Sequence, residues 1–192
     1  MKWKFLWLLA GCVLSTGAWA GTITSFTSGS AFATFTPGQS VTTSAGGPWN
    51  NIQFNWFDSA GAPLAGGTLY LLDQAYLGLP GNLGSAPGLL GSSISITAGV
   101  YNFDPSVTLQ SLTQYFFYAD VSLTTSGGNS GTTYAGGSVY FSTGTNPFAV
   151  QTTQDANFLL AGMPVAAPEP GTLALLGLGL AGLGLSRRRK AD

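Results

Sequence analysis

The chain lacks histidine and has a single cysteine, Cys12. Its basic residues are few and lie near the two ends: Lys2, Lys4, Arg187, Arg188, Arg189 and Lys190. Nucleic-acid binding requires a basic surface that displaces counterions from phosphates, and the central segment offers none. The central segment also contains no His and no Cys, which excludes catalytic triads built on an imidazole and zinc sites built from His and Cys there.

The first twenty residues have the three parts of a secretory signal peptide. Lys2 and Lys4 form a basic start, residues 5–17 are apolar, and Ala18-Trp19-Ala20 fits a cleavage site with small residues. We therefore expect residues 1–20 to engage the Sec translocon. Signal peptidase is then expected to cut after Ala20, which leaves Gly21 as the mature N-terminus.

Two other interpretations of this segment stay open. An uncleaved anchor helix is one, although the apolar run is short for a membrane span. The other is a lipobox, because Leu9-Ala10-Gly11-Cys12 resembles the site at which a bacterial cysteine becomes lipidated. Cys12 comes early in the chain for such a site.

The other end of the chain combines a short acidic motif, an apolar run and a basic cluster. Pro168-Glu169-Pro170 precedes the uncharged residues 171–186, and the cluster consists of Arg187, Arg188, Arg189 and Lys190. As a helix, residues 171–186 are about 24 Å long, against a hydrocarbon core of about 30 Å. We expect a transmembrane helix there, since arginines snorkel and the bilayer thins locally. The cations predict a cytoplasmic end, with the preceding chain across the inner membrane.

This order of parts resembles the PEP-CTERM sorting signal of Gram-negative bacteria, a tail also described as an ice-binding-protein C-terminal signature. The resemblance covers about residues 166–190. It implies recognition by a membrane exosortase through Pro168, Glu169 and Pro170, with the cluster 187–190 as the membrane stop. It also implies cleavage near that motif, transient anchoring in the inner membrane, and delivery to the outer surface or extracellular matrix.

Residues 21–162 are predicted to form one all-β domain, an antiparallel sandwich or jelly roll, joined to the tail by a linker over 163–167. Apolar residues alternate with polar ones between turn signals, most clearly at Ile52, Phe54 and Trp56. Expected strands also cover 31–36, ending at Pro37-Gly38, and 68–72, as the hairpin partner of the strand around Phe54. Residues 114–123 are aromatic on both faces and predict a central strand, and 74–91 predict a surface loop.

Five aspartates are the charged residues of this domain: Asp58, Asp73, Asp104, Asp120 and Asp155. No two lie close in sequence, and most sit at turns or strand ends, where they cap backbone amides. We expect no enzyme, and an Asp-based hydrolase is the weakest alternative. A calcium site assembled from separate loops stays open, although no EF-hand loop is present. Gly177 to Gly182 fits G-x-G-x-x-G, but inside an expected membrane helix it predicts no nucleotide cofactor.

The function expected from the sequence is that of an exported structural or adhesive protein of the cell surface or biofilm matrix. Ser and Thr are abundant, so O-linked glycosylation fits an exported domain. The alternative is a surface-attached module that binds a neutral polysaccharide, because the negative charge disfavours anionic glycans. Trp49, beside Gly47-Pro48, is the aromatic residue we expect to be exposed for such a contact.

Overall fold

The computed structural model describes residues 20–28, 30–31, 34–124, 126–127 and 133–165. This part of the chain is built almost entirely from strands and turns, and its one helix is the short 3-10 helix η1 (Pro80–Ser85). None of its helices is long and apolar enough to cross a membrane. The predicted transmembrane helix over 171–186 and all but the last residue of the predicted signal peptide lie outside the described residues. The strands are β1 (Gly21–Phe26), β2 (Ser30–Ala31), β3 (Thr36–Thr42), β4 (Trp49–Phe57), β5 (Pro63–Leu64), β6 (Leu69–Leu72), β7 (Leu89–Thr97), β8 (Val100–Phe103), β9 (Gln114–Ala119), β10 (Ser126–Gly127), β11 (Val139–Ser142), β12 (Ala149–Gln151) and β13 (Phe158–Pro164).

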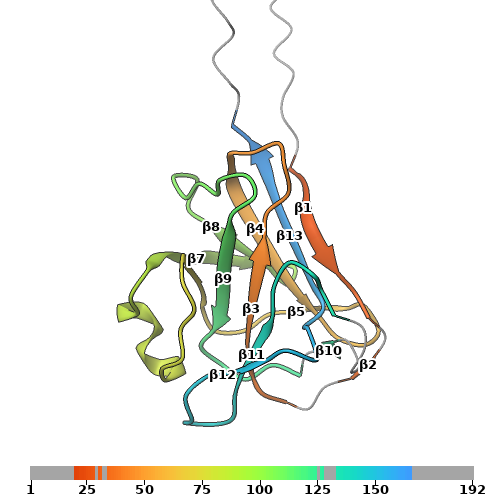
Figure 1. Ribbon diagram of the computed structural model, residues 1–192, viewed down its shortest axis with the longest axis vertical. Helices are drawn as coiled ribbons and strands as arrows, with labels where there is room; N and C mark the ends of the chain where they lie inside the picture. Colours follow the sequence, from red (N-terminus) through yellow and green to blue (C-terminus); the bar gives the residue numbers. More distant parts are fainter. Residues whose placement is uncertain (1–19, 29, 32–33, 125, 128–132, 166–192) are drawn as a thin grey trace, which may run out of the picture.

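One antiparallel sheet connects most of these strands, in the order β1-β13-β4-β8-β7-β6-β9-β3-β11-β12 (Figure 1). β5 adds to β4 beside this path, and β2 and β10 form a separate pair. β7 belongs to both halves of the sheet, because its first residues pair with β6 and its later residues pair with β8. The predicted all-β, antiparallel class is therefore confirmed, as one curled sheet. The finer prediction of a sandwich or jelly roll stays a prediction.

The curl brings the two halves of the sheet face to face around an aromatic core. The ring of Phe54 on β4 stacks on Phe117 of β9, with centroids 4.5 Å apart and planes 22° from parallel. Phe158 on β13 stacks on Phe54 from the neighbouring strand at 5.8 Å. Since β4 and β9 are not neighbours in the sheet, this contact exists only because the sheet folds back on itself.

A second apolar cluster covers the opposite face of the β6-β9-β3-β11 half. It consists of Leu72, Leu83, Ala86, Phe116, Tyr118, Tyr140 and Phe148. The expected surface loop over 74–91 supplies part of this cover, since it holds η1 and buries Leu83. β9 therefore has aromatic side chains in both clusters, Phe117 inside the curl and Phe116 outside. The expected central strand that is buried on both faces is therefore present, but it ends at Ala119 and does not extend to residue 123.

Pro37 and Gly38 do not end a strand, as the sequence suggested, but lie near the start of β3. Pairing of β3 with β9 begins at Gly38, so the missing amide hydrogen of Pro37 falls where that ladder starts. Gly38 is required by packing: a Cβ atom there would lie 2.3 Å from the ring of Tyr118. The turn preference of Pro37 and Gly38 is therefore overridden by the pairing of β3 with β9 and β11.

The predicted hairpin between the strand around Phe54 and residues 68–72 is also wrong. β6 pairs with β7 and β9, and the short β5 pairs with the end of β4 instead. The chain thus crosses from one half of the sheet to the other after β5. Sequence proximity favoured the hairpin, but the tertiary curl placed β6 in the opposite half.

The body begins and ends at the same end of the molecule. Gly21, the first residue of β1, is the register partner of Gly162 on β13 (Figure 1). β13 continues to Pro164, two residues beyond the predicted end of the body, and Val165 donates its amide hydrogen to Pro48 O at 2.8 Å. Of the predicted linker, residues 163–165 therefore lie against the body, and 166–167 fall outside the part of the chain that is described.

A buried polar bridge links the two halves of the curl. Gln39 on β3 is fully buried and donates from Nε2 to Asp155 Oδ1 at 2.8 Å, while its Oε1 accepts the amide hydrogen of Ala156 at 3.0 Å. Asp155 Oδ2 accepts the amide hydrogen of Tyr134 at 2.8 Å. Burial raises the pKa of the Asp155 carboxyl, and the hydrogen bonds from Gln39 and Tyr134 offset part of that rise. The bridge ties β3 to the residues that lead into β13.

Replacing Gly38 with alanine is expected to lower the free energy of unfolding by about 1–3 kcal/mol, because the new methyl group overlaps the buried ring of Tyr118. Urea unfolding of the two proteins measures this loss. Gly81→Ala is the matched control, since no atom lies within 4 Å of a Cβ at Gly81. An unchanged midpoint in Gly38→Ala would show that β3 does not pack as described.

Asp155 gives stability a defined pH dependence. Below its ordinary pKa of 3.8 the carboxyl is protonated in both the folded and the unfolded state. Because the pKa is raised in the folded state, stability is lost as the pH rises through the folded value, and the loss is complete above it. We therefore expect the unfolding free energy of the wild type, minus that of Asp155→Asn, to decrease from acidic to neutral pH. Chemical unfolding across that range measures the difference, and an increase with pH would contradict the raised pKa.

Candidate functional site

All residues of the predicted sorting signal, and part of the predicted signal-peptidase site, lie outside the described residues. This holds for Pro168, Glu169, Pro170 and the basic cluster 187–190, and for Ala18 of the predicted cleavage site. Ala20 is described, and it is exposed directly before β1. An exposed position agrees with access for a peptidase, but cleavage itself stays a prediction.

Trp49 is not the exposed aromatic residue that the sequence suggested. Its side chain is only 5% exposed and belongs to the core inside the curl. Trp49 also exchanges two backbone hydrogen bonds with Leu109, each 2.9 Å long. The expectation that Trp49 is exposed is therefore wrong, because its side chain lies in the core.

A β-bulge in β4 explains the burial of Trp49. Ile52, Phe54 and Trp56 point into the core with period two, and strict alternation would turn Trp49 outward. The pairing between β4 and β13 shifts register between Ala161 and Met163, and Asn51 has a positive φ of 48° at this point. One extra residue in the strand reverses the alternation, so Trp49 points inward.

Asp58 and Asp104 cap backbone amides in their own turns, and Asp120 caps the amide of Thr68 in a segment far away along the chain. Asp58 Oδ1 accepts the amide hydrogens of Ala60 and Ala62, both at 2.8 Å, and Asp120 Oδ1 accepts that of Thr68 at 2.8 Å. The carboxylate of Asp104 accepts hydrogen bonds from the hydroxyl and the amide of Ser106, and these bonds lower its pKa. Each of these carboxylates thus has a structural role, within a turn for Asp58 and Asp104 and between two segments for Asp120.

The other two aspartates are separated from these. Asp73 is exposed beside the loop that holds η1, whereas Asp155 is buried in the bridge to Gln39. Within the described ranges, no group of three or more His, Cys, Asp or Glu side chains is placed to hold a metal ion. The calcium site and the Asp-based hydrolase thus gain no support here.

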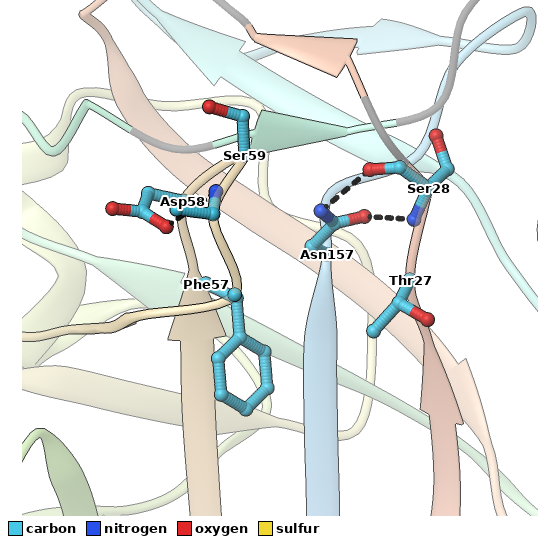
Figure 2. A pocket seen from close by; sticks show the side chains of 8 residues that line it. Thr27, Ser28, Phe57, Asp58, Ser59 and Asn157 are labelled. Carbon is cyan, nitrogen blue, oxygen red and sulfur yellow. Dashed lines mark hydrogen bonds between the residues drawn. The ribbon is translucent and has the colours of Figure 1, made fainter.

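The first cavity lies at the end of the body opposite Gly21 and has a volume of about 250 Å³. Figure 2 shows Asp58 and Ser59 on one side, Thr27 and Ser28 on the other, and Asn157 between them. Asn157 donates to Ser28 O at 2.8 Å and accepts from Ser28 N at 2.6 Å, so both ends of its amide take part in joining two segments of the chain. Asn157 therefore acts as a clasp between the end of β1 and the start of β13.

The second cavity lies on the outer face of β4, β8 and β7 and measures about 190 Å³. Its lining residues are Asn51, Ile52, Gln53, Ile94, Asn102, Phe103 and Pro105. Three of these side chains are neutral amides, and none is charged. The exposed Ile94 lies at a second register shift, between Ser93 and Ser95 of β7, so a bulge borders this cavity on each side.

Nothing in the sequence singles out Asn51, Gln53, Asn102 and Ile94 as members of one site. Asn51 and Gln53 are adjacent to the apolar alternation of one strand, but Asn102 and Ile94 come from other strands. A bulge shows no clear signal in a sequence, since it depends on the pairing partner. The pairing of β4 with β8 and of β8 with β7 brings these side chains together.

The comparisons with known proteins identify the tail and not the body. Searches of curated proteins and of solved structures give no match. Residues 166–190 match the family model of the PEP-CTERM protein-sorting motif, which begins directly after the last described residue, Val165. The chain therefore carries a PEP-CTERM sorting motif, as its Pro-Glu-Pro, apolar run and basic cluster predicted.

Proposed function

We propose that this protein is exported through the Sec translocon, processed by an exosortase, and displayed on the outer surface or in the extracellular matrix as a structural or adhesive protein. The sorting motif at 166–190 is the observation that carries this proposal. In it, the curled sheet serves as the sandwich-like body, and residues 171–186 serve as a transient helix in the inner membrane.

The position of the body's two ends supports such a display. Gly21 pairs with Gly162, and β13 leads through Val165 directly to the sorting motif. Processing at either end of the chain would therefore act on the same end of the body. The opposite end, with the turn around Asp58, would project away from the membrane while the tail is anchored.

The stability of the body fits an extracellular location, because its described core depends on packing and hydrogen bonds. The region from Gly21 to Ala167 contains no cysteine and no basic residue, so neither disulfides nor side-chain ion pairs stabilise it. Salt screens surface ion pairs and weakens them, whereas the stability from apolar packing does not depend on such pairs. Such a domain tolerates changes in redox state and ionic strength.

Replacing Pro168, Glu169 and Pro170 with alanine is expected to block exosortase processing. The wild type, expressed in an exosortase-competent host, should begin at Gly21, lose its tail near Pro170 and reach the outside. The variant should keep its tail and stay in the inner membrane. Intact mass and cell fractionation measure both properties.

The matched control for this experiment is Thr152→Ala with Thr153→Ala, two exposed positions in the body. It should be processed and exported like the wild type. If the wild type itself keeps the full tail in the inner membrane, the proposal is wrong and the protein is tail-anchored in the periplasm. A lipidated N-terminus at Cys12 would contradict the predicted cleavage after Ala20.

The exported form is also expected to be heavier than its polypeptide because of O-linked glycans. Thr124 and Thr133, at the two ends of an uncharged Ser- and Thr-rich segment, are exposed and accessible to a transferase. Mass spectrometry before and after alkaline β-elimination measures the excess. A mass equal to that of the processed polypeptide would contradict glycosylation.

A further inference from the structure

The cavity on the outer face of β4, β8 and β7 offers hydrogen-bonding groups that are complementary to a neutral, hydroxyl-rich ligand. Gln53 Nε2 donates to Asn102 Oδ1 at 3.0 Å, and Asn102 Nδ2 donates to Val100 O at 3.2 Å. These bonds hold two amide side chains in fixed orientations. Each amide nitrogen carries a second hydrogen, so both retain donor capacity.

The acceptor capacity of the cavity is also incompletely used. Among the described residues, Gln53 Oε1 and Asn51 Oδ1 accept no hydrogen bond, while Asn51 Nδ2 donates to Asn50 Oδ1 and to the Met163 sulfur. A wall of amides with free donors and free acceptors pairs well with hydroxyl groups, because each hydroxyl both donates and accepts. An anion would meet only the donors, without a cation to balance its charge.

An apolar surface lies beside these amides. Ile94, at the bulge of β7, is 63% exposed. Pro105, which follows the end of β8, is also exposed. Phe103 and Ile52, both buried, complete the lining from below. Sugar rings combine hydroxyl edges with C–H faces, so a site of amides next to an exposed apolar side chain fits both parts.

The backbone around the cavity departs from regular strand geometry at two points. Asn51 occupies the left-handed region with a φ of 48°, and register shifts occur at Asn51 in β4 and at Ile94 in β7. Bulges next to binding sites re-aim single side chains, and a strained non-glycine residue is often retained at such sites. Here they turn Asn51 and Ile94 toward the same cavity.

We propose that this cavity, defined by Asn51, Gln53, Asn102 and Ile94, binds one sugar unit of a neutral polysaccharide. Its volume of about 190 Å³ is below the roughly 300–1,000 Å³ typical of sites for larger ligands, which favours a single unit of a longer chain. The uncharged lining and the acidic body disfavour anionic polysaccharides. The site gives the adhesive role proposed above a specific ligand class and rests on that role.

The full-length chain, purified in detergent, is tested for retention on immobilised glucan, mannan and galactan, with polygalacturonate as the anionic comparison. We expect retention on at least one neutral polysaccharide. Gln53→Leu should weaken it about tenfold, since leucine keeps the approximate size and removes both hydrogen-bonding groups. Asn102→Leu should have a similar effect.

Gln151→Leu is the matched control, because Gln151 is an exposed amide on the edge strand β12, outside the cavity. This substitution makes the same chemical change as Gln53→Leu. Its retention should equal that of the wild type. Ile94→Ser provides a second test if Gln53→Leu fails to fold, since Ile94 is largely exposed and outside the core. This variant should also weaken retention about tenfold.

No retention on any neutral polysaccharide would overturn the proposal. Retention that is equal in the wild type and in folded Gln53→Leu, Asn102→Leu and Ile94→Ser would place binding elsewhere and would also overturn it. So would retention on polygalacturonate alone. Because binding is measured on purified protein, failure here leaves the sorting experiment unaffected, and failed sorting leaves binding measurable.

Discussion

The stacking of Phe54 on Phe117 is the contact on which the architecture depends. It joins β4 and β9, which are separated along the sheet by β8, β7 and β6, so it forms only when the sheet curls. Aromatic pairs contribute about 0.5–1.5 kcal/mol beyond the area they bury. In a body without disulfides, such contacts must provide the cohesion that secreted domains often obtain from cystine bridges.

Two consequences follow from the curl. The buried bridge between Gln39 and Asp155 becomes necessary, because a carboxylate inside the core requires donors, and Gln39 and the Tyr134 amide supply them. The half of the sheet that contains β9 is covered on both faces, whereas the outer face of β4 and β8 presents half-buried amides. This outer face therefore presents neutral amides beside the exposed side chain of Ile94.

The tail and the body have separate roles in the chain. The motif at 166–190 specifies a route of export, and β13 connects the body to it with almost no spacer beyond Val165. The body contributes a curled sheet whose described residues form a cavity clasped by Asn157 and another bordered by bulges. The sorting motif and the residues that line these cavities lie in separate segments of the chain.

The sequence alone determined the sorting motif, the all-β class and the central position of residues 114–119, because these depend on local order, composition and period-two alternation. It did not determine that β3 runs through Pro37 and Gly38, that β6 leaves β4, or that Trp49 is buried. Those outcomes depend on pairing between distant strands and on the bulge at Asn51, which reverses the alternation within β4. The cavity of Gln53, Asn102 and Ile94 likewise exists only in the folded sheet, since register decides which side chains of separate strands meet.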